Sequence, residues 1–245
     1  MIKTFLGAAS AAILSLTLLA PAAYAAPPAA AFGELPVAKD GAISPDGTRV
    51  AAIVNNGGNY YVVSKSLANP AEKPWTLPVG EKVYPGSIVW ANDDMFLLSI
   101  SRDGKYAGTP YTQTFLFAAN VKTQEADVLV KPKGYFRQFN DRIVSLLDDD
   151  PEHILMAYAN ETFDSFPDVK KVNLKTGKES VFMKAKDGIE YWRADDEGRP
   201  MIGWGRSESR NEIRMIIRDP NDDSWDSIKK FPGLTDETPI YGVLK

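Results

Sequence analysis

The sequence predicts an all-β fold, a β-propeller of about four four-stranded blades plus the first strand of a fifth. The first observation behind this prediction is a strand–turn–strand unit at Ala42–Ile53 (AISPDGTRVAAI). Its Ser-Pro-Asp-Gly stretch favours a tight turn, because proline presets φ, aspartate bonds the nearby backbone and glycine tolerates positive φ. Near-copies of the unit follow at Ser87–Leu98, Arg142–Tyr158 and Tyr191–Ile202.

The second observation is the regular spacing of these copies. Taking Asp46, Asp93, Asp149 and Asp196 as equivalent, the intervals are 47, 56 and 47 residues. A period of this size, in copies that favour strands, is typical of propeller blades. A second motif keeps the same rhythm: Ala119–Glu125 matches Val172–Glu179, and each is predicted to join the third and fourth strands of a blade. A β-sandwich or an unrelated all-β fold is the alternative.

These motifs place the blades at about residues 41–77, 87–130, 142–183 and 191–229, with the next blade beginning at 233–245. One segment competes with this division, because Ile213, Ile216 and Ile217 have helical spacing. We predict a strand over Glu212–Arg218, since it occupies the third-strand position. An incomplete ring leaves two apolar blade faces without neighbours, so we expect an open, marginally stable arc that self-associates, unless the chain closes as a smaller ring.

Residues 1–25 are predicted to be a secretory signal peptide, with Lys3, an apolar core and the small-residue site Ala23-Tyr24-Ala25. Residues 26–40 follow as a leader. We therefore expect an exported protein, periplasmic or secreted, with no membrane attachment after cleavage; an uncleaved anchor is the alternative. The chain has 28 Lys and Arg against 32 Asp and Glu. These dispersed charges argue against binding of nucleic acid or anionic membranes.

No catalytic, cofactor-binding or metal-binding residue is predicted. The single histidine, His153, lies in a predicted turn, and no G-x-S-x-G motif would present a nucleophilic serine. The absence of cysteine excludes thiolate chemistry and disulfides. Four aspartate clusters are interpreted as turn residues, with calcium binding as the alternative. They are Asp93-Asp94, Asp148-Asp149-Asp150, Asp195-Asp196 and Asp222-Asp223.

Two further features are assigned to packing. Gly203-Trp204-Gly205 is too short for a nucleotide-binding loop and lies in a predicted strand. Trp90, Trp192 and Trp204 are interpreted as residues that pack between blades rather than as ligand platforms.

The Ser-Pro-Asp-Gly type turns, the Asn-Leu-Lys-Thr-Gly turn at Asn173–Gly177 and the Gly33–Pro36 stretch after the export signal resemble a known family. It is the N-terminal half of bacterial prolyl oligopeptidase family serine peptidases, especially acylaminoacyl and dipeptidyl peptidases. The resemblance implies a propeller that limits peptide access to an α/β-hydrolase domain carrying the Ser, Asp and His. That domain has no counterpart here, so no triad residue is carried over, and the resemblance implies a truncated product or a fragment.

Two functions follow as expectations. In the first, the chain is the exported, non-catalytic propeller portion of such a peptidase, inactive alone. In the second, it is a self-sufficient periplasmic propeller, similar to TolB, that binds a protein or peptide partner. The predicted contact surface for the second is a long inner loop, Asp103–Tyr111, with Tyr106 and Tyr111.

Overall fold

The computed structural model describes residues 36–131, 137–159, 166–207 and 212–232, which form sixteen β-strands and no helix. The predicted signal peptide, most of the leader and the predicted start of a fifth blade at 233–245 lie outside these ranges. No helix in the described ranges is long and apolar enough to cross a membrane.

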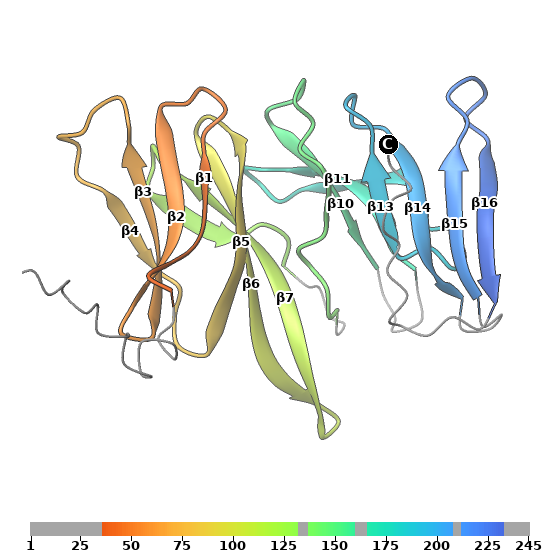
Figure 1. Cartoon of the computed structure of the whole chain (residues 1–245), viewed down its shortest axis with the longest axis horizontal. Coiled ribbons are helices and arrows are strands. Elements are labelled where there is room, and N and C mark those ends of the chain that lie inside the picture. Colours follow the sequence, from red (N-terminus) through yellow and green to blue (C-terminus); the bar gives the residue numbers. More distant parts are fainter. Residues whose placement is uncertain (1–35, 132–136, 160–165, 208–211, 233–245) are drawn as a thin grey trace, which may run out of the picture. The chain divides into compact units, whose positions relative to one another are not determined.

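The strands make four four-stranded sheets, each an antiparallel meander whose strands pair in chain order. Figure 1 shows the sheets following one another along the chain. This confirms the all-β, propeller-type fold with four blades. The strands are β1 (Ala38–Ile43), β2 (Arg49–Asn56), β3 (Asn59–Ser66) and β4 (Trp75–Pro78); β5 (Val83–Asn92), β6 (Met95–Tyr106), β7 (Thr109–Asn120) and β8 (Glu125–Val128); β9 (Ile143–Ser145), β10 (His153–Tyr158), β11 (Asp168–Asn173) and β12 (Glu179–Met183); β13 (Tyr191–Ala194), β14 (Pro200–Ser207), β15 (Glu212–Arg218) and β16 (Trp225–Pro232).

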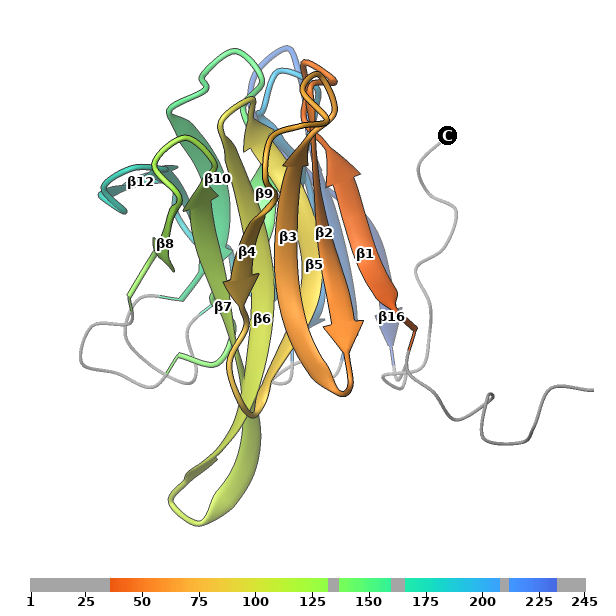
Figure 2. The same cartoon turned by 90° about the vertical axis from the view of Figure 1, so that its left-hand side faces the viewer.

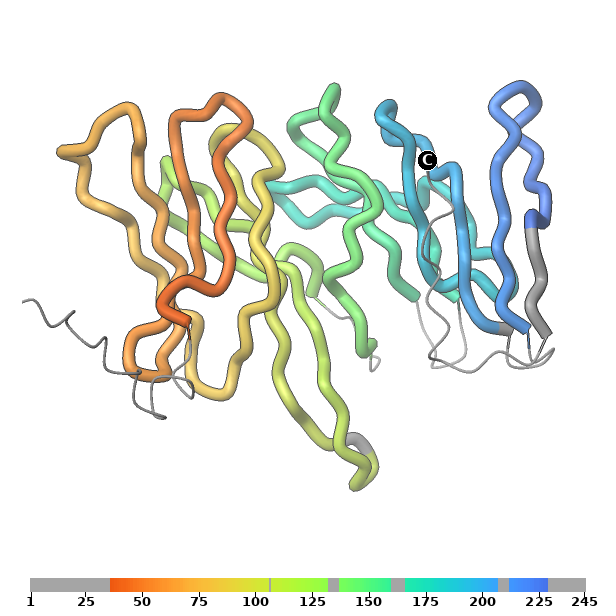
Figure 3. Tube along the Cα trace, in the orientation of Figure 1, coloured from red at the N-terminus to blue at the C-terminus, as the bar shows by residue number. Residues whose placement is uncertain are grey.

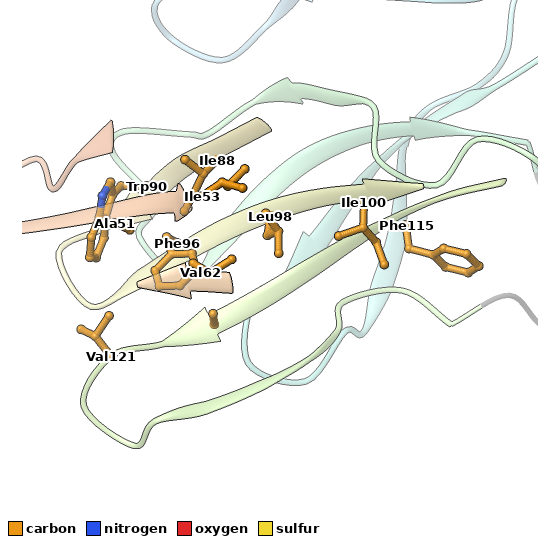
Figure 4. Packing of buried hydrophobic residues seen from close by; sticks show 11 residues of the cluster. Ala51, Ile53, Val62, Ile88, Trp90, Phe96, Leu98, Ile100, Phe115 and Val121 are labelled. Carbon is orange, nitrogen blue, oxygen red and sulfur yellow. The ribbon is translucent and has the colours of Figure 1, made fainter. Parts of the chain in front are cut away.

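Hydrophobic clusters join consecutive sheets. Between the first and second sheets, Ile53 and Val62 pack against Ile88, Trp90 and Phe96 (Figure 4). The Phe96 ring lies edge-on to Trp90, with centroids 5.5 Å apart. Packing of apolar faces between neighbouring four-stranded sheets is how propeller blades are stabilised.

Two further clusters repeat this arrangement. Leu97 and Leu116 of the second sheet meet Ile154, Met156 and Val172 of the third. Leu155 and Val169 of the third sheet meet Trp192 and Ile216 of the fourth. Alternate residues of β10 belong to the two clusters, so this strand is buried on both faces, which explains its apolar run from Ile154 to Tyr158.

The first sequence motif forms the turn between the first two strands of every sheet. In the first copy, the Ser44 hydroxyl donates to Asp46 at 2.6 Å and Gly47 has a φ of 72°. The turns also contact one another across blades: the Asp46 N–H donates to the Asp93 carboxylate at 3.0 Å, and the Asn92 side chain donates to the Pro151 carbonyl at 2.7 Å. The motif therefore links blades as well as strands.

The second motif joins the third and fourth strands, as predicted. The side-chain oxygen of Asn120 accepts from the N–H groups of Lys122 and Thr123, at 2.9 and 3.0 Å. Asn173 accepts from two backbone N–H groups in the same way, at 3.2 and 2.9 Å. These are Asx turns, in which a short amide side chain replaces a backbone acceptor.

The helical spacing of Ile213, Ile216 and Ile217 gives way to a strand, and β15 has the predicted bounds, Glu212–Arg218. Three sheets extend beyond the predicted blade limits: β1 begins at Ala38, β5 begins at Val83 and β16 continues to Pro232.

The predicted loop at Asp103–Tyr111 is wrong. β6 and β7 continue through it in register up to the pair Tyr106↔Thr109, and the turn is only Ala107-Gly108. Both turn residues have positive φ, 47° and 83°, which matches the twist of a two-residue hairpin. Gly104 lies in the strand beneath the Tyr111 ring, whose nearest atoms are 2.8 Å from where a Cβ on Gly104 would stand. An aromatic ring covering a strand glycine stabilises such a pair.

Candidate binding groove

His153 is held in place by its neighbours. Its Nδ1 lies 2.9 Å from a carboxylate oxygen of Asp150, and its Nε2 lies 3.4 Å from the side-chain nitrogen of Asn173. Lys171 lies 2.6 Å from the same carboxylate. Lys171 first, and His153 second, lower the pKa of Asp150 to about 2. The structure places His153 at the first position of β10 and not in the predicted turn, and its imidazole bonds the turn residue Asp150.

The aspartate clusters also hold turns. Asp195 accepts from the backbone N–H of Arg199 at 2.7 Å, and its carboxylate lies 2.8 Å from the guanidinium of the same residue. Asp222 accepts from the Ser224 N–H at 2.8 Å. Within the described ranges, no group of three or more histidine, cysteine or acidic side chains is close enough together to hold a metal ion.

The Gly203-Trp204-Gly205 stretch lies in β14 and is required by packing. A Cβ on Gly203 would stand 2.6 Å from the Trp192 ring, and one on Gly205 would stand 2.5 Å from backbone atoms of Gly188 and Glu190. Trp192 packs between the third and fourth sheets, and Trp90 donates its ring N–H to the Ala42 carbonyl at 2.9 Å. Both tryptophans pack between blades, as predicted.

Trp204 differs from this prediction, because it stacks on Tyr191 beside a groove. The two ring centroids are 5.6 Å apart and the ring planes are 14° from parallel. The groove has a volume of about 560 Å³ and runs between β9 and β13, the first strands of the third and fourth sheets. Volumes in this range are typical of ligand sites.

Arg142 occupies one end of the groove. Its guanidinium carbon lies 4.5 Å from the centroid of the Phe139 ring and 4.4 Å from that of Tyr191. The guanidinium donates to the Glu190 carbonyl at 3.1 Å and reaches the Tyr191 hydroxyl at 3.5 Å. Phe139 is 42% exposed and Tyr191 is 41% exposed, although both side chains are large and mostly apolar. This end therefore presents a cation flanked by open aromatic surface.

The other end of the groove is acidic. Asp148, Asp195 and Asp196 line it, and only Asp195 pairs with a cation among the described residues. A Cβ on Gly198 would stand 2.4 Å from Leu147, so the turns of the two sheets are in close contact there. Tyr191 and Asp195 are four residues apart, a strand distance of about 13 Å. The groove thus has a cationic aromatic end and an acidic end.

Comparison with known protein families gives no match, and no curated protein matches the sequence. Among solved structures, an oligogalacturonate lyase in complex with manganese is 12% identical, with a TM-score of 0.47 over 78% of this chain and 53% of that one. TolB from Acinetobacter baumannii is 12% identical, with a TM-score of 0.39 over 77% and 41%. Acylaminoacyl peptidase from Pyrococcus horikoshii is 16% identical, with a TM-score of 0.45 over 79% and 32%.

The chain therefore spans between about a third and about half of the length of these three proteins. Similarity at this level carries no information about activity.

The sequence does not predict this groove. Arg142 and Tyr191 open the third and fourth copies of the first motif, so both were visible as equivalent positions. Their contact depends on how two blades pack, which the spacing of the copies does not specify. Trp204 is the register partner of the exposed Tyr191 on β13. That pairing is not visible in the sequence, so the sequence indicates only a packing role for Trp204.

Proposed function

We propose that this chain is the exported, non-catalytic propeller portion of a prolyl oligopeptidase family serine peptidase, and that it binds peptides in the groove between β9 and β13. The family assignment rests on the turn motifs, which lie at equivalent positions in successive blades. In such peptidases a propeller limits the access of peptides to a hydrolase domain.

The observation that carries peptide binding is the aromatic surface around Arg142, where Phe139 and Tyr191 are exposed and Trp204 is half-buried. Large apolar side chains that gather at one exposed place mark an interaction site, and aromatic residues with arginine are typical of binding hot spots. Arg142 contacts backbone and rings, and it forms no ion pair with a described residue. A site with these groups suits a ligand that offers both apolar side chains and hydrogen-bond acceptors, as a peptide does.

We expect fluorescently labelled peptides of about three to twelve residues to bind the purified chain. The double variant Tyr191→Ala with Trp204→Ala should weaken binding at least about tenfold, because each ring contributes buried apolar contact. Fluorescence anisotropy measures this change. The matched control is Tyr84→Ala, since Tyr84 is 50% exposed on β5, the equivalent strand of the second sheet.

Failure of every peptide to bind, or equal loss in the control variant, would overturn the proposed function. A second assay addresses the absence of catalysis. The chain alone should release no chromophore from aminoacyl or dipeptidyl anilides, and a serine-dependent release would contradict the proposal.

A second candidate function is that of a self-sufficient periplasmic propeller that binds a protein partner. The hairpin of β6 and β7 favours it. β5 pairs with β6 only as far as Val83↔Arg102, and β8 pairs with β7 only over Phe117–Asn120. Residues 103–112 thus form a two-stranded ribbon that projects beyond the other strands (Figures 2 and 3). A two-stranded ribbon is marginally stable by itself, so a partner that packs on it would stabilise it.

The ribbon's edges are protected from pairing with other strands. Pro110 has no N–H, and its register partner Lys105 is charged. A partner is therefore expected to contact a face of the ribbon, where Tyr111 lies over Gly104, rather than to add a strand.

Trimming the ribbon tests this second function. Replacing residues 103–112 by Asn-Gly joins Arg102 to Gln113, which are already register partners. We expect the fold to retain its stability within about 1 kcal/mol, because the four-stranded part of the sheet is unchanged. If the ribbon binds a partner, the trimmed chain should recover it from periplasmic extract at least about tenfold less well. Equal recovery of partners by both chains would show that the ribbon is not the binding surface.

A further inference from the structure

The arginines that line the groove lack acidic partners. Arg142 and the exposed Arg193 both line it, and neither forms an ion pair with a described residue. The other arginine near this turn, Arg199, is paired with Asp195 and Glu197. Arg142 stands at one end of the groove and Arg193 lies on β13, between Tyr191 and Asp195. Unneutralised guanidinium groups of this kind attract an anionic ligand group.

The surroundings of Arg142 determine how such a group can approach. Phe139 and Tyr191 lie over the guanidinium at 4.5 and 4.4 Å, so a ligand reaches it at its edge, where the N–H groups are. Guanidinium has five donors, and the described contacts to Glu190 and Tyr191 occupy two of its nitrogens with one bond each. The remaining donors suit a carboxylate, which guanidinium binds through two parallel hydrogen bonds.

The position of the aromatic rings limits which carboxylate fits. Tyr191 and Trp204 form a stacked apolar surface beside the guanidinium, so the ligand should carry an apolar side chain next to its carboxylate. The acidic end, about 13 Å away along the strand, disfavours a second negative charge there. A peptide C-terminus meets these conditions: it has one terminal carboxylate, an adjacent side chain and a chain that continues along the groove.

We propose that the groove binds the free C-terminus of peptides, with the terminal carboxylate on Arg142 and an apolar last side chain on Tyr191 and Trp204. This inference rests on the proposed function, because it specifies which part of a peptide the groove recognises. The peptide then runs from Arg142 towards the acidic turn of Asp148 and Asp196.

The test compares a tetrapeptide ending in phenylalanine with its C-terminal amide, by calorimetry on the full chain. The amide keeps every side chain but replaces the charged carboxylate with a neutral group that has one acceptor oxygen and an NH2 donor. We expect amidation to weaken binding at least about tenfold, and acetylation of the amino end to change it less than about threefold. Arg142→Gln should remove the difference between acid and amide.

Arg102→Gln is the matched control, because Arg102 also lies over an aromatic ring, 4.7 Å from the centroid of Phe115, but outside the groove. It should preserve the preference for the acid. Equal binding of acid and amide to the unchanged chain would overturn the inference while leaving peptide binding intact. If Arg142→Gln does not fold, the comparison of acid and amide peptides on the unchanged chain still tests whether the groove recognises the C-terminal carboxylate. Displacement of the peptide by millimolar inorganic phosphate would also overturn it, because the site would then be a general anion site.

Discussion

Replacing Gly177 with alanine is expected to destabilise the fold by about 3 kcal/mol. Gly177 lies in the turn between β11 and β12, and a Cβ there would stand 2.2 Å from the carbonyl oxygen of Leu129, the residue that follows β8 of the second sheet. Neither group can move alone, since the Leu129 N–H bonds the Leu116 carbonyl at 2.8 Å and the Gly177 N–H bonds the Asn173 carbonyl at 2.9 Å. The added methyl must push the second and third sheets apart.

The equivalent turn of the second sheet shows that backbone conformation alone does not explain this effect. Gln124 occupies the matching position with a φ of 57°, close to the 63° of Gly177, and it carries a side chain. A left-handed φ for a residue other than glycine costs about 1 kcal/mol, so the larger part of the expected loss comes from the contact with Leu129.

Urea unfolding of the two variants, Gly177→Ala and Gln124→Ala, measures how much each substitution lowers the free energy of unfolding. The control should change the free energy of unfolding by less than about 0.5 kcal/mol. Equal effects at the two positions would mean that the close approach to Leu129 does not hold the blades together.

These two turns also show what the sequence could predict. Asn120 and Asn173 were recognised as equivalent because each turn is closed by its own side chains, within a few residues. Local chemistry of this kind is visible in a sequence. The contact of Gly177 with Leu129 is not, because it joins residues 48 positions apart whose meeting depends on the packing of two sheets.

Contacts between residues far apart in the sequence also explain why the loop prediction was wrong and why the groove was not predicted. The loop predicted at residues 103–111 is a hairpin instead, because Gly104 pairs with Tyr111 across it. Arg142 and Tyr191 were visible in the repeats, but the groove that they form needs a particular offset between two blades. Charged residues in strands raise a related difficulty, because a lysine such as Lys170 is normally expected on the surface.

Lys170 is only 4% exposed and belongs to a buried polar cluster between the second and third sheets. Its ammonium lies 4.4 Å from the centroid of the Tyr158 ring, and the guanidinium of Arg137 lies 4.3 Å from the same centroid. The Tyr158 hydroxyl donates to the Glu179 carboxylate, which also lies 3.5 Å from the Lys170 ammonium. Glu179 thus places a negative charge among two cations and one ring.

The pKa values reflect this arrangement. Burial lowers the pKa of Lys170, and the charge of Glu179 opposes that shift. Burial also lowers the pKa of Arg137. For Tyr158, burial raises the pKa and the hydrogen bond to Glu179 raises it further, so the hydroxyl stays protonated and acts as a donor.

Glu179→Gln should therefore destabilise the fold by about 3 kcal/mol at neutral pH, because removing one charge leaves the buried cations less compensated. The effect should depend on pH. The folded-state pKa of Lys170 lies below its unfolded value, so the unfolded chain binds more protons between the two values and stability rises with pH there. Without Glu179 that pKa falls further, so the deficit of the variant should shrink as pH rises towards about 10.

Urea unfolding at about pH 7 and pH 9.5 measures both effects, and Glu125→Gln is the control. Glu125 begins β8 as Glu179 begins β12, in the matching copy of the same motif, but its carboxylate forms no hydrogen bond or ion pair with a described residue. Its replacement should therefore cost less than about 0.5 kcal/mol. Adding Lys170→Met to Glu179→Gln should recover at least half of the loss, since it removes the cation that Glu179 neutralises. A double variant less stable than Glu179→Gln at both pH values would show that Lys170 stabilises the cluster through other contacts, and the charge-balance explanation would be wrong.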